Sequence, residues 1–521
     1  MAIKIKTPKL EGRPLTWLLL FTAGMAFLLF GYDMGVCGGV TELHAFRATF
    51  GYPDATILGL MVASYNIGCL AGAALAFCLG DWLGRKRSII FGCVVVSIGA
   101  VLQCSAFSQA QWIVGRIIAG IGTGSISSTV PVWVSECSKP HRRGVLVILE
   151  VTIVIGGIAL SNWSNYGFIY RSPWLNGTDT QWRVPIAGQL VFPLFVFATI
   201  GMCPESPRWL AQVGRYDEVA PLLARLHGKN ISVDEPEVQA LTDSIIQTAK
   251  HEAAIGDTNW RECFEMGELQ NFRRLVLCGL AGFFQQATGI QVVVYYAPAV
   301  FANVGMDPEM SFIMAGGAQL AFLVGSALPT LYIERLGRRR AMMMCSAMTG
   351  TCMLAVAVCV ALGGKHPEWK VSTGWAATVF IFIYEFTFGM GWNSMSWLYG
   401  SEVASFRLRN KGSATQNLCN WATAIIAVMT TPIGLQNIGW CFYLVWATVT
   451  LAGIPIVYCC FPETSGRSLE QMDLFFAKYR HWRINKVAHE WIELPSDDIA
   501  ASPMPDSKNS FSHVEEKIVG V

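Results

Sequence analysis

The sequence predicts an all-α membrane protein of twelve transmembrane helices, arranged as two six-helix halves with both termini in the cytoplasm. Three observations support this prediction: an apolar composition, twelve apolar segments long enough to span a bilayer, and two motifs that occur once in each half. Of the 521 residues, 53% are hydrophobic and 14% are charged. Soluble domains carry about 25% charged residues, so this chain has too little polar surface for a soluble fold.

The composition also excludes several function classes. The net charge is only +2 at pH 7, so a nucleic-acid partner is not implied. Most of the sixteen cysteines fall within apolar segments, where cysteine acts as a small hydrophobic residue. The sequence has no paired Cys-x-x-Cys motifs, no His/Cys cluster and no recognisable nucleophile with its base. We therefore expect no metal site, no disulfide framework and no enzymatic activity.

Twelve apolar segments have the length that a membrane requires. A hydrocarbon core of about 30 Å needs about 20 helical residues. We expect spans at 17–37, 57–79, 88–107, 112–134, 145–167, 184–203, 275–302, 312–333, 341–363, 375–400, 413–436 and 440–461. The first apolar run exceeds signal-peptide length and has no small-residue cleavage site, so we expect it to be retained as a span.

The spans divide the chain into four regions. These are an N-terminal half at 1–203, a cytoplasmic linker at 204–274, a C-terminal half at 275–461 and a cytoplasmic tail at 462–521. The linker is polar, and we expect short helices in it, including an amphipathic one around Tyr216 to Leu226. The end of the tail is rich in Ser, Pro, Asp and Glu, which predicts that the tail is largely disordered.

Basic residues predict the orientation, because cytoplasmic loops retain Lys and Arg. With both termini inside, only Arg47, Arg171, Arg183, Lys365 and Lys370 lie outside and Arg116 lies within a span, so nearly all of the 38 basic residues are inside. The sequon at Asn176 then lies outside, where glycosylation occurs, and the sequon at Asn230 lies inside.

Two motifs recur in both halves. The segment 81–87 (DWLGRKR) follows the second span, and the similar segment 334–340 (ERLGRRR) follows the eighth. Likewise, Ser135-Glu136 with Arg143 recurs as Ser401-Glu402 with Arg409. Because the motifs keep their order and their side of the membrane, they indicate two parallel halves with a central site between them, which is the plan of a transporter that rocks about that site.

The repeated charges are candidates for a cytoplasmic gate. Carboxylate and guanidinium groups at helix ends can form paired hydrogen bonds between neighbouring helices, which hold one conformation and break in the other. The alternative is that the basic residues reflect orientation alone; we favour the gate because carboxylates recur with them. Its expected members are Arg85, Glu136, Arg143, Glu205, Arg208, Arg338, Glu402 and Arg409.

At these motifs the chain resembles the sugar porters of the major facilitator superfamily, and specifically their fungal members. The resemblance covers about 12–475 and includes 31–33 (GYD), the two Gly-Arg loops, 204–210 (PESPRWL), Gln285-Gln286 and 462–464 (PET). The run 181–185 (QWRVP) and the acid Glu150 are most similar to the branch that contains yeast proton-coupled glycerol carriers. The resemblance implies the major facilitator fold.

Ionisable residues inside spans are costly and therefore functional candidates. The resemblance implies that Asp33 carries the transported proton and that Arg116 is its partner. This is physically sensible, because a nearby cation favours the charged carboxylate, whereas enclosure favours the neutral one. A static structural ion pair is the alternative. Glu150 either binds a solute hydroxyl or assists proton movement, and for Glu385 we favour a structural role nearer the outer interface.

A sugar is recognised by amides that hydrogen-bond its hydroxyls and by aromatic faces that pack on its C–H groups. The resemblance assigns these roles to Gln285, Gln286, Gln291, Trp397, Asn420 and Trp421. The chain departs from the family where Val151 and Ile158 replace frequent glutamines. It departs again where Asn393-Ser394 and Ser396 replace the usual Gly-Pro and Pro. Fewer polar groups in the fifth span suggest a ligand that is smaller or less hydroxylated than glucose.

We therefore expect a carrier that moves a monosaccharide or polyol across a fungal plasma membrane by alternating access, in symport with protons. The partners are the solute, protons and the lipid bilayer; we expect a monomer without a cofactor. Two alternatives remain open. One is a proton-coupled carrier of a quinate-like or uronic acid or of a fungal metabolite, and the other is a non-transporting sugar sensor, which the short tail disfavours.

Overall fold

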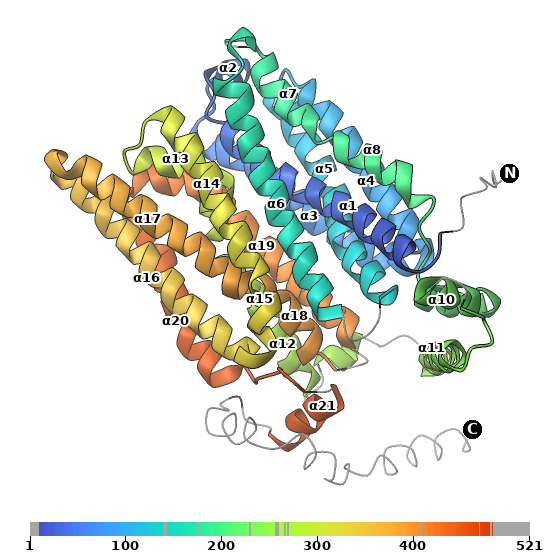
Figure 1. The fold of residues 1–521 in the computed structure, drawn as a ribbon. Coiled ribbons are helices and arrows are strands. Elements are labelled where there is room, and N and C mark those ends of the chain that lie inside the picture. The colour runs from blue at the N-terminus through green and yellow to red at the C-terminus, as the bar shows by residue number, and fades with distance from the viewer. Residues whose placement is uncertain are drawn as a thin grey trace.

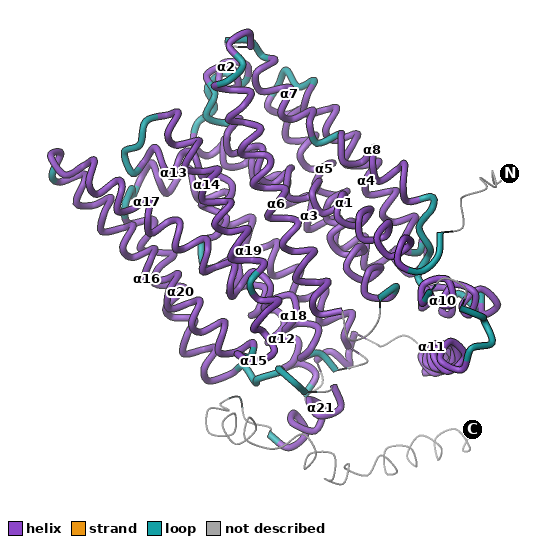
Figure 2. Tube along the Cα trace, viewed as in Figure 1, coloured by secondary structure: helices purple, strands orange, loops and turns teal. Residues whose placement is uncertain are grey.

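The computed structural model describes residues 10–138, 143–175, 177–228, 231–255, 260–264, 267, 270–405, 408–467, 469–479 and 482. Within these residues the protein is helical and contains no strand (Figure 2). Twelve helices or helix pairs of the described chain are long and apolar enough to cross a membrane. The predicted all-α fold with twelve spans is thereby confirmed, and the orientation of the termini stays a prediction.

The N-terminal half contains the first six spans (Figure 1). They are α1 (Arg13–Val40), α3 (Ala55–Leu83), α4 (Arg85–Cys104), α5 (Gln109–Glu136), α6 (Arg143–Tyr170) and the pair α7 (Thr180–Gly188) with α8 (Val191–Ile200). A short helix, α2 (His44–Thr49), lies between the first two spans. Helix α5 packs against both α3 and α4, and α1 packs against α6.

The C-terminal half contains the other six spans, and several of them are interrupted. They are α12 (Asn271–Ala287) with α13 (Ile290–Asn303), α14 (Pro308–Ala327) with α15 (Pro329–Leu336), α16 (Arg338–Lys365), α17 (Lys370–Phe388) with α18 (Ser394–Val403), α19 (Arg409–Asn437) and α20 (Cys441–Cys460). A π-helical segment, η6 (Gly389–Asn393), joins α17 to α18. Gly289, with φ of 85°, separates α12 from α13, because glycine adopts this left-handed backbone without strain.

The linker and part of the tail are also helical. Helices α9 (Pro207–Gln212), α10 (Val219–His227) and α11 (Pro236–Ile255) pack on one another through a small core that includes Trp209, Leu223 and Val238. In the segment predicted as a tail, α21 (Leu469–Lys478) is an ordered helix held by an ion pair between Arg274 and Asp473 (2.5 Å). The disorder expected near the C-terminus lies outside the described residues.

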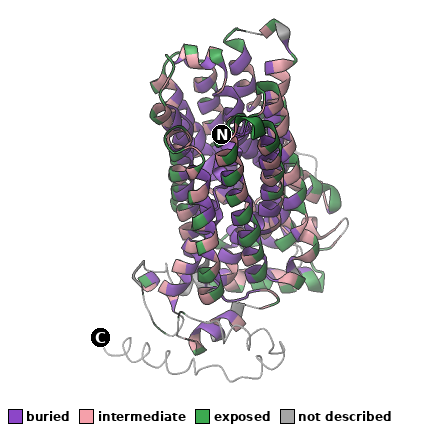
Figure 3. Ribbon diagram, turned by 90° about the vertical axis from the view of Figure 1, so that its left-hand side faces the viewer, coloured by how far each residue is buried: buried purple, intermediate pink, exposed green. Residues whose placement is uncertain are grey.

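Burial follows the pattern expected of a protein in lipid. Buried residues lie between the helices, and exposed residues follow their outer faces (Figure 3). Many exposed side chains are large and apolar, for example Leu194, Leu331 and Ile426. Such residues are unfavourable in contact with water over so wide a surface, so the outer faces of the helices fit the hydrocarbon of a bilayer.

Candidate functional site

Asp33 and Arg116 form an ion pair in the interior of the N-terminal half. Asp33 lies on α1 and Arg116 on α5, and the guanidinium Nη1 is 2.6 Å from the carboxylate Oδ1. Both side chains are completely buried. The guanidinium also lies 4.4 Å from the centre of the Tyr65 ring on α3, a favourable cation–π contact. The structure therefore brings together the two residues predicted to couple transport to protons.

The pair leaves polar atoms without a protein partner. Oδ2 of Asp33 and Nε and Nη2 of Arg116 are buried and make no hydrogen bond to the protein. Buried polar groups are normally paired, so these atoms have unused capacity for a proton, a water molecule or a changed set of contacts.

Four predicted solute-binding residues form one hydrogen-bonded chain of amides. Gln291 Nε2 donates to Gln286 Oε1 (2.8 Å), and Gln286 Nε2 donates to Asn420 Oδ1 (3.1 Å). Asn420 Nδ2 donates to Gln285 Oε1 (2.5 Å), and Gln285 Nε2 donates to the backbone oxygen of Asn393 (3.3 Å). The chain thus connects the seventh, eleventh and tenth spans at buried positions.

The helix break in the seventh span positions this chain. Gln285 and Gln286 occupy the last turn of α12, and Gln291 lies in the first turn of α13. Because the turn at Gly289 separates them, Gln291 can reach back to Gln286 across a gap of five residues. The amides predicted to recognise a sugar are thereby held in one cluster by the local backbone.

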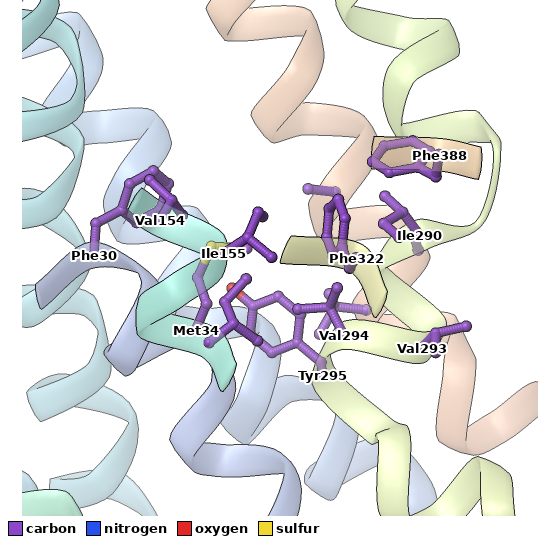
Figure 4. Packing of buried hydrophobic residues seen from close by; sticks show 14 of the residues in the cluster. Phe30, Met34, Val154, Ile155, Ile290, Val293, Val294, Tyr295, Phe322 and Phe388 are labelled. Atoms are coloured by element: carbon purple, nitrogen blue, oxygen red, sulfur yellow. The ribbon is translucent and has the colours of Figure 1, made fainter. Parts of the chain in front are cut away.

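The amide chain lies on the side of the C-terminal half that faces α1. Trp421, next to Asn420, is buried with its ring 5.9 Å from that of Phe30 on α1. Figure 4 shows Phe30 and Met34 from the N-terminal half on one side, with Ile290 and Tyr295 of the C-terminal half on the other. The indole Nε1 of Trp421 has no protein partner. Trp397, the other predicted aromatic residue, is half-buried on α18.

Direct hydrogen bonds connect the two halves at several depths. Tyr295 donates to Oδ1 of Asn66 on α3 (2.9 Å), close to the ion pair of Asp33. Two further bonds run from Thr152 to the Ser326 backbone oxygen (3.0 Å) and from Asn417 to Ser128 (3.2 Å). These contacts between the halves were not predicted from the sequence. A polar side chain within a span was the available signal, but it does not identify a partner on another helix.

Two further acids are buried within the bundle. Glu150 on α6 is 3% exposed, and its Oε1 has no protein partner. Glu385 on α17 is completely buried and accepts a hydrogen bond from Gln319 on α14 (2.7 Å). Its contact with α14 was not predicted, because the hydrophobic pattern of α17 does not reveal which face α14 covers. Its depth relative to the outer interface stays a prediction.

The repeated motifs build the same arrangement in each half. Arg85 forms a two-bonded ion pair with Glu136 (3.1 and 3.2 Å), and Arg338 pairs with Glu402 (2.9 Å). Each pair joins neighbouring helices of one half, so neither connects the two halves in this structure. Their opening and closing during transport stays a prediction.

A carboxylate caps the helix that follows each motif loop. Glu205 accepts from the backbone N–H of Arg85 (3.1 Å) at the start of α4. Glu463 likewise accepts from the backbone N–H of Arg338 (2.8 Å) and Arg339 (3.2 Å) at the start of α16. Glu463 was not among the predicted gate residues. The repeated Pro-Glu in 204–206 and 462–464 was the signal that could have found it.

The loops that lead into these helices turn at glycine. Gly84 and Gly337 have φ of 81° and 84°, and a Cβ at Gly337 would lie 2.4 Å from Glu463. Glycine is therefore needed at Gly337 both for its backbone and for the close carboxylate. The end of the bundle that carries Gly84 and Gly337 is called the motif end below.

The remaining predicted residues are only partly described. Arg208 is half-buried on α9. The side chains of Arg143 and Arg409, and the whole of Asn176, lie outside the described residues. No group of three or more His, Cys, Asp or Glu that could hold a metal ion occurs in the described part of the chain.

Comparisons with known proteins identify relatives of this chain. The chain is 37% identical over 473 residues to the MFS-type transporter oryC of Aspergillus oryzae, covering 90% of this chain and 86% of that protein. It is 33% identical over 485 residues to the sugar transporter STL1 of Saccharomyces cerevisiae, covering 90% and 82%.

Solved structures share the fold. The xylose transporter XylE from E. coli, in a partially occluded inward open conformation, matches with a TM-score of 0.72 at 23% identity, covering 87% of this chain and 100% of that chain. The proton:xylose symporter XylE bound to 6-bromo-6-deoxy-D-glucose matches with a TM-score of 0.73 at 24% identity, covering 89% and 99%. A family model described as "Sugar (and other) transporter" matches residues 19–476. The chain therefore belongs to this family of membrane transporters.

Proposed function

We propose that this transporter carries a monosaccharide or a polyol by alternating access and that proton symport drives it. The observation that carries the proposal is the buried amide chain from Gln291 to Gln285. Amides both donate and accept, as hydroxyl groups do, so a polyhydroxylated solute can exchange hydrogen bonds with them one for one. Such an exchange costs little net free energy, whereas a solute without hydroxyls would leave the amides unpaired.

Asp33 and Arg116 supply the coupling in this proposal. When Asp33 is ionised, its charge holds the guanidinium of Arg116; when a proton neutralises it, that attraction weakens. Arg116 also contacts Tyr65, the residue before Asn66, and Asn66 accepts the bond from Tyr295 of the other half. Protonation can therefore change the contacts between the halves through a short series of packed residues.

One protein with the same fold is named a proton:xylose symporter, and this supports coupling of solute transport to protons. The basic residues of the motif loops support a cytoplasmic position for the motif end. With that orientation, an inward proton gradient across a plasma membrane drives solute accumulation in the cell. The gate residues at the motif end then act on the cytoplasmic side.

An uptake experiment tests the proposal. Yeast cells that lack their own hexose and glycerol carriers are transformed with the gene and offered labelled D-glucose, D-xylose, D-sorbitol and glycerol at external pH 5 and pH 7.5. We expect saturable uptake of at least one of these solutes, faster at pH 5 and abolished by a protonophore. Uptake that does not change with external pH and is not inhibited by the protonophore would contradict symport. Uptake of quinate or a uronic acid alone would assign the carrier to organic acids instead.

A further inference from the structure

The break in the tenth span holds three neighbouring polar side chains that have no protein partner. Asn393 ends the π-helical segment η6, and Ser394 and Ser396 begin α18. All three residues are buried, and Nδ2 of Asn393 and the two hydroxyls make no hydrogen bond within the protein. A buried donor without an acceptor is unfavourable, so such a cluster calls for a partner. Single-turn π segments are also frequent at functional sites.

Asn393 is connected to the amide chain. Its backbone oxygen accepts the hydrogen bond from Gln285 Nε2 (3.3 Å), so the residue is the last member of that chain. The preceding residue, Trp392, donates its indole N–H to Ser346 on α16 (2.8 Å), and the centre of its ring lies 6.2 Å from that of Phe284 on α12. The segment is therefore anchored to α16 by Trp392 and to α12 by the ring of Trp392 and the backbone oxygen of Asn393.

Free hydrogen-bonding atoms occur at both ends of this chain. Gln291 Oε1 is buried without a protein partner at one end, and Asn393 Nδ2 is buried without one at the other. A solute that replaces amide–amide bonds in the middle of the chain can therefore find an acceptor at one end and a donor at the other. The fifth span, in contrast, has apolar Val151 and Ile158 where it could have carried amides.

We propose that Asn393 is a solute-binding residue whose side-chain amide hydrogen-bonds one hydroxyl of the transported monosaccharide or polyol. Part of the recognition of that solute is then made by the tenth span, in place of the glutamines that the fifth span lacks. This inference rests on the proposed function. Asn393 belongs to η6, the break between α17 and α18. The hydrogen bond from Asn393 to the solute therefore connects solute binding to this break.

The test compares Asn393→Ala with a matched control, Thr387→Val. Thr387 lies in the same span, and its hydroxyl is also buried without a protein partner, but its backbone oxygen accepts from Cys345 on the α16 side. Apparent KM is measured for the best transported of D-glucose, D-xylose, D-sorbitol and glycerol, and for analogues of it that each lack one hydroxyl. Cell-surface abundance is measured for each variant, and Asn393→Ser is included in case the alanine variant does not reach the surface.

We expect Asn393→Ala to raise the apparent KM for the complete solute about tenfold. For one analogue, the variant and the unchanged protein should have the same apparent KM, because the hydroxyl that Asn393 binds is missing. The Thr387→Val protein should resemble the unchanged protein with every solute. An equal loss for all analogues, or no loss for any, would overturn the assignment of Asn393 while leaving the proposed function intact. Absence of transport by the unchanged protein would overturn the proposed function and this assignment with it.

Discussion

At the scale of single residues, the structure separates two kinds of buried polar group. The amides of Gln285, Gln286 and Asn420 bond to one another, so they are stable without solute and can exchange partners when it binds. Asp33 and Arg116, in contrast, carry full charges and leave several atoms unpaired. The first kind suits recognition of a neutral solute, and the second suits a change of charge.

Gln286 is the residue at which recognition can be tested most simply, because its amide both donates and accepts within the chain. Replacing Gln286 with Ala should raise the apparent KM tenfold or more, since unpaired solute hydroxyls cost on the order of 1–3 kcal/mol. Labelled-solute uptake over a concentration series measures this. The control is Gln212→Ala, at an exposed amide on α9. Unchanged affinity in the Gln286→Ala protein would remove Gln286 from the site.

At the scale of elements, the repeated motifs show how two helix starts are stabilised. The first N–H groups of α4 and α16 have no partner within their own helices, and Glu205 and Glu463 accept from them. The negative charge also lies at the positive end of the helix dipole. These carboxylates therefore fix the angle at which each motif loop enters its helix, independently of any gate.

Removal of either cap should destabilise the protein. We expect Glu205→Ala and Glu463→Ala each to cost about 1–2 kcal/mol and to lower the apparent unfolding temperature in detergent by a few degrees. A fluorescence-monitored thermal scan of the purified protein measures the shift. Asp243→Ala, at an exposed position in the interior of α11, provides the comparison and should leave the temperature unchanged. Equal unfolding temperatures for all three variants would show that the caps do not stabilise the fold.

At the scale of the whole molecule, much of the architecture could be predicted from the sequence. The spans follow from apolar length, because bilayer thickness sets the number of residues that a helix needs. The partners of buried side chains could not be derived in this way. The bonds from Tyr295 to Asn66 and from Gln319 to Glu385 depend on how helices rotate against one another. Helices apolar on most faces give weak periodicity, so the sequence leaves that rotation open.

The orientation of the molecule is a separate prediction. Both termini and the linker between the halves should be cytoplasmic, because the basic residues of the motif loops lie at that end. Tags at either end should be protected from protease added to intact cells. Asn176→Gln should abolish a glycosylation-dependent mobility shift, and Asn230→Gln should not affect it. Cleavage of both tags by external protease would show that the termini are extracellular. The motif end would then lie outside the cell, against this prediction.

Proton-driven accumulation is the central claim, and it can be measured directly with purified protein in proteoliposomes. An imposed inward proton gradient should concentrate labelled solute in vesicles that contain the unchanged protein, and a protonophore should collapse this accumulation. The Asp33→Asn protein keeps the size of the side chain but cannot release a proton, so it should still exchange solute across the membrane without concentrating it. The Glu150→Gln protein should still concentrate solute. The opposite result, with accumulation retained in Asp33→Asn and lost in Glu150→Gln, would contradict the account and place the proton site on α6.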